Sequence, residues 1–310
     1  MTNKQIISYK TPPYLIPGDT VAITCPAKKL PRDILEAVKL LESWKLNVIL
    51  GETVNASWHQ FAGNDELRAS DMQRFLDDTN IKAIFAARGG YGTIRIIDHL
   101  DFSIFRNHPK WIIGFSDITV LHSHIQALYR TESIHGQMPL TIPDGSSVSL
   151  ETLRKALFNE PLEYTYKSKV INRSGESNGI LIGGNLTLMV MMAGSVSEQD
   201  YAGKILFLED VGEYLYSLDR MMWNLKRSGK LTNLKGLIVG SFTEIKDNDI
   251  PFGQTAEQII MEHVKEFDFP VCFNFPAGHI ADNRALIFGR KINLNVEGQH
   301  VRLTYSEIQS

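Results

Sequence analysis

The sequence has little cysteine, no block of like charge and no long apolar run. Its only two cysteines, Cys25 and Cys272, lie far apart in apolar stretches typical of buried strands, which favours free thiols over a disulfide. The 32 basic and 35 acidic residues give a net charge of -3, and no run of one sign is suited to following a nucleic-acid backbone. Residues 1–19 mix polar residues with prolines, so they form neither an apolar signal-peptide core nor a membrane span. We therefore expect a cytoplasmic protein without a nucleic-acid or membrane partner.

Metal-binding motifs are also missing. The sequence contains no His-Glu-x-x-His pattern and no cysteine cluster. His122 and His124 fall on one expected helix, but a spacing of two residues points them to different sides. We expect neither a metal nor an organic cofactor.

The first half alternates short β-branched runs with amphipathic helical stretches, which is typical of a parallel sheet covered on both faces. Strands are predicted at 20–24, 46–50, 83–87 and 111–115, and helices at 66–78 and 32–44, the latter opened by Pro31. This pattern predicts a doubly wound α/β layout.

A linker is predicted at 141–178, where Pro, Gly, Ser and Asp become frequent and a helical stretch at 150–158 leads into polar residues. Beyond it the chain is richer in strands and ends in β structure, with helical patterns at 216–226 and 256–266. The expected strands are 204–208, 236–242, 271–274, 285–288, 292–296 and 301–305. The simplest organisation is a first domain at 1–140 and a strand-rich α/β domain at 179–310, with a cleft between them.

Ser116 follows the apolar strand predicted at 111–115 and precedes a helical pattern at 118–128. Open α/β sheets bind ligands at this end of a parallel strand. The turn would expose the hydroxyl, and the N–H of Asp117 would lie at a helix N-terminus, where it can stabilise an oxyanion. Ser116 or Asp117 acting only as a helix cap is the alternative.

A glycine-rich loop, Ala87-Arg-Gly-Gly-Tyr-Gly, follows the preceding strand. Its glycines allow a close approach to a ligand, so its N–H groups could complete an oxyanion hole, although a simple tight turn has the same composition. Arg88 is a candidate for holding a substrate carboxylate, and a structural salt bridge is an equal alternative.

A serine hydroxyl needs an imidazole to accept its proton and a third group to orient that imidazole. His279 lies in a loop rich in Gly and Pro after the strand at 271–274, where a side chain can point into a cleft. Glu209 ends the apolar run at 204–208, and a carboxylate there is costly to bury without a partner. The alternatives are a surface histidine, and a glutamate that caps a helix or pairs with a lysine.

Seven motifs in register resemble the LD-carboxypeptidase family, which includes microcin-immunity peptidases. They span nearly the whole chain: Ala87-Arg-Gly-Gly-Tyr-Gly, Gly114-Phe-Ser-Asp, His135-Gly-Gln-Met, Gly183-Gly-Asn-Leu, Leu208-Glu-Asp-Val-Gly-Glu, Leu218-Asp-Arg-Met and Pro276-Ala-Gly-His. Each motif alone is weak, but their order is specific.

The resemblance implies a nucleophile at Ser116, a general base at His279 and an orienting carboxylate at Glu209, with an oxyanion hole from the N–H groups of Gly90 and Asp117. It also implies a flavodoxin-like first domain, a homodimer, and release of a terminal D-amino acid from a muropeptide in peptidoglycan recycling. Substrate-binding candidates are Arg88, Gly89 and Tyr91.

Departures from the family pattern concern specificity. Gln137 stands where a proline is frequent, and Tyr214-Leu215 replaces a pair that usually contains proline. Three alternatives stay open: an immunity-type peptidase acting on an acyl or peptidyl nucleotide conjugate, a non-catalytic α/β protein that binds an anion, and a cysteine hydrolase using Cys25.

Overall fold

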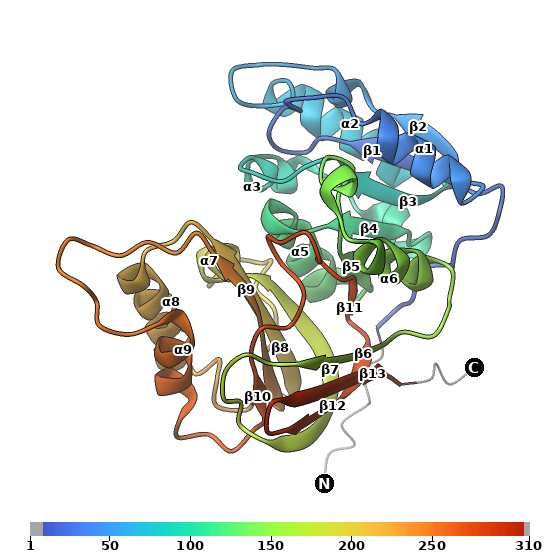
Figure 1. Cartoon of the computed structure of the whole chain (residues 1–310). Coiled ribbons are helices and arrows are strands. Elements are labelled where there is room, and N and C mark those ends of the chain that lie inside the picture. The colour runs from blue at the N-terminus through green and yellow to red at the C-terminus, as the bar shows by residue number, and fades with distance from the viewer. Residues whose placement is uncertain (1–8, 307–310) are drawn as a thin grey trace, which may run out of the picture.

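Two β-sheets organise the chain in the computed structural model, which describes residues 9–306 (Figure 1). The first sheet has the strand order β11-β5-β4-β3-β1-β2. Five of its strands are parallel and follow the flavodoxin-like order 2-1-3-4-5, which confirms the expected fold class. They are β1 (Thr20–Thr24), β2 (Asn47–Leu50), β3 (Ile81–Ala86), β4 (Trp111–Gly114) and β5 (Ser133–His135).

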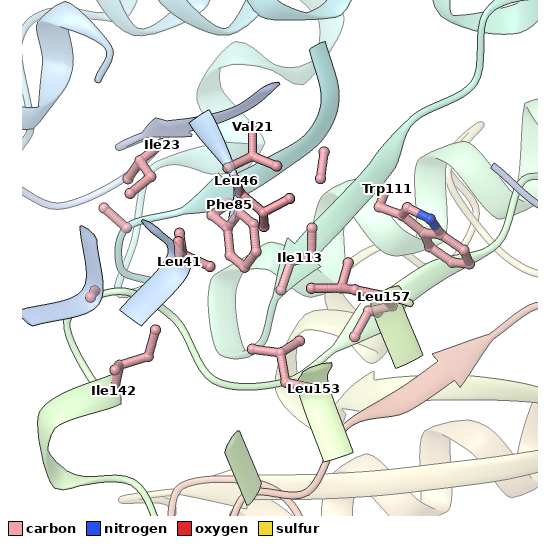
Figure 2. Close-up of a cluster of buried hydrophobic side chains, with 14 of the residues drawn as sticks. Val21, Ile23, Leu41, Leu46, Phe85, Trp111, Ile113, Ile142, Leu153 and Leu157 are labelled. Carbon is pink, nitrogen blue, oxygen red and sulfur yellow. The ribbon is translucent and has the colours of Figure 1, made fainter. Parts of the chain in front are cut away.

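Helices cover both faces of this sheet because alternate strand residues point to opposite sides. Val21, Phe85 and Trp111 belong to one buried cluster, together with residues of α1 (Leu35–Ser43) and α6 (Ser147–Leu157) (Figure 2). Their neighbours along the strands pack into a second cluster on the other face. That cluster includes residues of α2 (Asp65–Asp77), α4 (Ser103–Asn107) and α5 (Thr119–Tyr129).

The second sheet has the order β10-β9-β8-β7-β12-β13-β6. Its parallel part comprises β7 (Gly175–Asn185), β8 (Lys204–Val211), β9 (Gly236–Thr243) and β10 (Val271–Cys272), and its antiparallel part comprises β12 (Lys291–Glu297), β13 (His300–Tyr305) and β6 (Glu163–Lys167). One face is covered by α7 (Leu186–Met191), α8 (Leu215–Arg227) and α9 (Ala256–Val264), and α8 and α9 lie side by side (Figure 1).

The remaining helix is the short α3 (Thr93–Ile96), and single 3-10 turns occur at Glu52–Val54, Ile97–His99, Ser116–Ile118 and Ile142–Asp144.

Strand β11 (Leu286–Phe288) links the two sheets. It comes late in the chain, after β10, yet it pairs antiparallel with β5 at the edge of the first sheet (Figure 1). Ile287 packs into the first core, whereas Leu286 and Phe288 face the core of the second sheet. A three-residue strand therefore belongs to both cores.

One expected helix and the expected linker need correction. The helix expected at 32–44 begins only at Leu35, so Pro31 lies outside it. The Asp33 carboxylate accepts the N–H of Leu35, the first residue of the helix. Residues 141–178, expected as a linker, contain α6, β6 and the start of β7. We propose that the chain still divides into domains at 1–140 and 179–310, with this segment contributing to both.

Among residues 9–306, no helix combines the length and the apolar character needed to cross a membrane.

Replacing Phe288 by alanine should destabilise the fold by about 3–5 kcal/mol, because a buried phenylalanine leaves a large cavity. Its ring is fully buried and lies 6.1 Å from Phe207 and 5.6 Å from His135, at the junction of the sheets. Urea unfolding followed by circular dichroism would measure the loss. Leu128→Ala, at a site 47% exposed, is the control and should cost well under half as much; equal losses would contradict a shared core at β11.

Candidate active site

Ser116 occupies a strained turn between β4 and α5. Its φ is 62°, a left-handed conformation that costs a non-glycine residue about 1–3 kcal/mol. The preceding Phe115 is extended, so the chain reverses sharply at the serine. His122 Nε2 lies 2.9 Å from the carbonyl oxygen of Gly114 and supports the end of the strand. Strain of this kind at a strand-to-helix turn is what presents a nucleophilic hydroxyl.

The glycine-rich loop after β3 lies directly against this turn. A methyl group on Gly89 would fall 3.0 Å from Ser116 Cβ and 3.3 Å from the backbone nitrogen of Asp117, so a larger residue there would press on the serine turn. The backbone hydrogen bonds of residues 9–306 include none donated by the N–H groups of Gly90 or Asp117. Both N–H groups are therefore free to donate to a ligand.

Glu209 lies in β8 and is completely buried. Its Oε2 accepts a hydrogen bond of 2.7 Å from His279 Nδ1, and Oε1 has no protein partner. A buried carboxylate needs compensation, and the imidazole is the group that supplies it here. This contact also fixes the tautomer, because Nδ1 must carry the proton and leaves Nε2 free to accept one.

The loop between β10 and β11 brings His279 to the first domain. A methyl group on Gly278 would come within 2.9 Å of Glu209 Oε2 and 2.3 Å of Ser241 Oγ, so this approach also requires glycine. The His279 ring packs edge-on against Phe115, with ring centroids 5.0 Å apart. His279 thus contacts Phe115, the residue next to Ser116. The His279 ring is hydrogen-bonded to Glu209, and no hydrogen bond joins it to the Ser116 hydroxyl.

Acidic groups govern the protonation of His279. Burial lowers the pKa of His279, but the charge and hydrogen bond of Glu209, with help from Asp210 and Glu244, outweigh it, and the net shift is upward. Burial and the neighbouring Glu209 raise the pKa of Asp210 to about 6. Asp210 points to other partners, since Asn185 Nδ2 and the Thr187 N–H donate to it at 2.8 and 2.9 Å.

A pocket of about 300 Å³ opens beside His279, with walls from both halves of the chain: Phe115, Gln137, Thr141 and Asp144 from one, Ile280 and Ala281 from the other. Gln137, singled out in the sequence as a departure, donates from Nε2 to the carbonyl of Ala281 at 2.9 Å. Its amide therefore ties one wall of the pocket to the other.

The remaining candidates lie around the glycine-rich loop. Arg88 uses Nη1 to donate to the carbonyl oxygen of Lys29 at 2.8 Å. Tyr91 is 45% exposed and packs on Phe61. Sequence reasoning missed Lys28, whose side chain lies along Gly90, within 2.6 Å of where a methyl group would sit. In the part of the chain that the structure describes, its ammonium forms no ion pair, and a lysine in the loop after β1 gave no sequence signal.

Within residues 9–306, no three His, Cys, Asp or Glu side chains gather closely enough to hold a metal ion.

Comparisons with known proteins agree over most of the chain. The family described as LD-carboxypeptidase N-terminal domain matches residues 21–136, and the one described as LD-carboxypeptidase C-terminal domain matches 178–294. A probable murein peptide carboxypeptidase of Bacillus subtilis is 34% identical over 298 residues, which cover 93% of this chain and 92% of that protein. A murein tetrapeptide carboxypeptidase of Pseudomonas aeruginosa is 33% identical over 303 residues, 91% of this chain and 94% of that protein.

Solved structures share the fold. The muramoyltetrapeptide carboxypeptidase of Oxalobacter formigenes superimposes with a TM-score of 0.84 and 29% identity, over 94% of this chain and 100% of that one. The microcin C7 self immunity protein MccF in its wild-type apo state has a TM-score of 0.84 and 20% identity, over 96% and 98% of the two chains. At that identity the second likeness concerns the fold alone.

Replacing Glu209 by glutamine should move the pH dependence of Ser116 reactivity to lower pH. In the wild type, the labelling rate with a fluorophosphonate should fall with acidification through a midpoint above about 6.5, the ordinary histidine value, because the imidazolium cannot accept a proton. Without the Glu209 charge, burial dominates and the midpoint drops. The rate at neutral pH should also fall by about 10²–10⁴-fold, as the wrong tautomer becomes favoured.

Glu244→Gln is the matched control, because Glu244 is an exposed carboxylate that acts on His279 through its charge alone. Solvent screens that charge, so the midpoint should move little. A Glu209→Gln protein with an unchanged midpoint would contradict the proposed pairing.

Proposed function

The chain belongs to the LD-carboxypeptidase family of serine peptidases, and from this premise we propose that it hydrolyses the bond before a C-terminal D-amino acid of a muropeptide. We assign Ser116 as nucleophile, His279 as general base and Glu209 as orienting carboxylate. One observation carries the assignment: the fully buried Glu209 has His279 as its partner, and that imidazole packs against the residue beside a strained serine.

The residues divide the reaction into two half-reactions. His279 Nε2 takes the proton of Ser116 Oγ as the oxygen bonds to the scissile carbonyl carbon. Collapse of the tetrahedral intermediate breaks the C–N bond, and the imidazolium returns the proton to the leaving amine, which departs as a free D-amino acid. Water then attacks the acyl-enzyme, with His279 again as base, and restores the serine.

The unpaired N–H groups of Gly90 and Asp117 are the proposed oxyanion hole. Asp117 follows Ser116 directly, and Gly90 follows Gly89, the loop residue that lies against Ser116 and the Asp117 nitrogen. The negative charge develops on the carbonyl oxygen only as Oγ attacks, so donors fixed in advance by the loop and the turn favour the transition state over bound substrate. No charged side chain is required for this task.

A terminal carboxylate on the substrate requires a cation near the glycine-rich loop. Arg88 is the candidate from the sequence, and one of its guanidinium nitrogens is held by the Lys29 carbonyl. We propose that Lys28 shares the role, because its stem lies along Gly90 and its ammonium forms no ion pair with residues 9–306. The pocket beside His279, about 300 Å³, is small for a whole ligand and would take one residue of the peptide.

The alternatives differ in substrate or in chemistry. An immunity-type peptidase acting on a nucleotide conjugate would use the same three residues, so side-by-side assay of both substrate classes separates the two. A non-catalytic anion-binding protein would not react with a fluorophosphonate at Ser116. A cysteine hydrolase at Cys25 is disfavoured, because burial raises the pKa of this thiol to about 12.

We further propose a cytoplasmic homodimer that acts in peptidoglycan recycling. The family resemblance supports the dimer and the pathway, and two free buried thiols are compatible with a reducing compartment. Light scattering that gave the mass of a single 35.0 kDa chain would exclude the dimer.

Replacing Ser116 by alanine should abolish release of the terminal D-amino acid from a murein tetrapeptide, with a loss of about 10⁴–10⁶ in kcat. The fold should survive, because the Ser116 hydroxyl forms no hydrogen bond within residues 9–306 and the change to alanine removes only one oxygen atom. Ser123→Ala, a buried serine on the helix that follows, is the control and should keep normal turnover. Normal hydrolysis by Ser116→Ala would refute the assignment.

Replacing Lys28 by methionine keeps the stem and removes the charge. We expect KM for the tetrapeptide to rise about 10–100-fold, the value of a charge-assisted hydrogen bond, and Arg88→Met to have a similar effect. A tetrapeptide amidated at its C-terminus should be insensitive to both changes. Lys29→Met is the control, since Lys29 is exposed and bonded to Ser57 Oγ at 3.0 Å. An equal effect of Lys28→Met on both substrates would contradict carboxylate binding.

A further inference from the structure

Two buried polar side chains beneath the His279 loop have no role in the reaction described above. His135 ends β5 in the first sheet, and Asn283 lies at the far end of the loop that carries His279. Both are completely buried. His135 Nε2 lies 3.1 Å from Asn283 Oδ1, and the same oxygen accepts the N–H of Gly278 at 2.8 Å. The residue next to His279 is thereby connected to the first sheet.

The hydrogen-bond chemistry fixes the orientation of both groups. The Gly278 N–H can only donate, so the atom of Asn283 that faces it must be the oxygen. That oxygen can only accept, so His135 must carry its proton on Nε2. Burial, above all, lowers the pKa of His135 to about 3, and the ring stays neutral over the working pH range. The contact is therefore a permanent donor-to-acceptor link.

The link comes at a cost to stability. His135 Nδ1 and Asn283 Nδ2 are buried without partners, and each such atom costs about 1–3 kcal/mol. An apolar pair of similar volume would avoid that cost. A buried hydrogen bond has a defined direction and length, so it fixes the position of Asn283 relative to His135 more specifically than apolar contacts would.

The pair is part of a wider attachment of the loop. Ser146 donates from its backbone N–H to the Ala281 carbonyl at 2.9 Å and from Oγ to the Asp282 carboxylate at 2.7 Å. Gln137, two residues after His135, donates to the same carbonyl. Of these contacts, the one through Asn283 is the closest in sequence to His279, because it ends on Gly278.

Phe115 shows how the geometry reaches the nucleophile. The centroid of its ring lies 5.7 Å from that of the His135 ring and 5.0 Å from that of the His279 ring, so Phe115 contacts both. A shift of the loop away from His135 would move His279 relative to Phe115 and hence to Ser116. Misplacement of a reacting group by about 1 Å costs roughly 100-fold in rate.

We propose that His135 and Asn283 are positioning residues that set the distance of the general base from the nucleophile. This inference rests on the proposed function of Ser116 and His279. It assigns a role to the His135-Gly-Gln-Met motif, which the reaction mechanism leaves unexplained.

The test compares two replacements of His135. Glutamine places an amide donor near the position of Nε2, whereas leucine fills a similar volume without a donor. We expect His135→Leu and Asn283→Ala to lower kcat for the murein tetrapeptide about 10–100-fold with KM changed less than about threefold, since binding groups are untouched. His135→Gln should keep kcat within about threefold of the wild type. The fluorophosphonate labelling rate of Ser116 should follow the same order.

His124→Leu is the matched control. His124 is also a buried histidine, and its one hydrogen bond, to Ser197 Oγ at 2.9 Å, lies away from the loop. This change should lower the melting temperature without lowering kcat. If His135→Leu keeps full turnover, if His135→Gln loses as much as His135→Leu, or if His124→Leu loses as much as either, the inference is wrong.

Failure of the two proposals can be told apart. Absence of tetrapeptide hydrolysis by the wild type, with Ser116 still labelled, would refute the proposed substrate, and the labelling rates would still test the pair. A wild type that is neither active nor labelled would refute both. If His135→Leu does not fold, the comparison of kcat between Asn283→Ala and His135→Gln decides. If Asn283→Ala also unfolds, the pair serves stability and the inference is overturned.

Discussion

The pairing of β11 with β5 is the constraint on which the site depends. Strand β10 lies in the second sheet and β11 lies in the first, so the segment between them must cross from one sheet to the other. His279 is in that crossing segment. Because both ends are fixed by strand hydrogen bonds, the imidazole is held at the border between Glu209, from the second sheet, and Ser116, from the first. Without this pairing, each sheet would carry only part of the site.

Strand geometry explains why two adjacent carboxylates have different roles. Successive side chains of β8 point to opposite faces, so Glu209 faces His279 while Asp210 faces the start of α7. Asp210 receives hydrogen bonds from Asn185, Thr187 and Val211, which stabilise its charge and tie α7 to the sheet. Glu209 has one partner. The His279 imidazole is therefore hydrogen-bonded to Glu209 and is affected by Asp210 only through its charge.

The sequence predicts four of the five parallel strands of the first sheet, because these are apolar runs separated by amphipathic helices, but it does not predict β5, which has only three residues, Ser133–His135. It does not predict β7 either, since this strand begins with polar residues and closes with Gly183, Gly184 and Asn185, residue types that sequence patterns assign to loops. The return of β11 to the first sheet leaves no local signal either, because its pairing partners in β5 lie 151 to 155 residues earlier in the chain (286 − 135 and 288 − 133) and are set by tertiary packing. Motifs therefore suggested Ser116, Glu209 and His279, while the contacts that position them, through His135 and Asn283, required coordinates.

The distribution of unfavourable features indicates what the fold stabilises. In the described portion of the chain, twelve buried side-chain polar atoms lack a partner, and five of them belong to His122, His135, Glu209, Ser241 and Asn283, which surround the site. The strained φ of Ser116 lies there as well. Native folds keep few such atoms, and a region selected for stability alone would pair or remove them. Four of these five residues, Glu209, His135, Asn283 and Ser241, belong to or contact the loop that carries His279, and two apolar cores that share β11 support that loop. A site that gives up stability for fixed geometry would show this pattern.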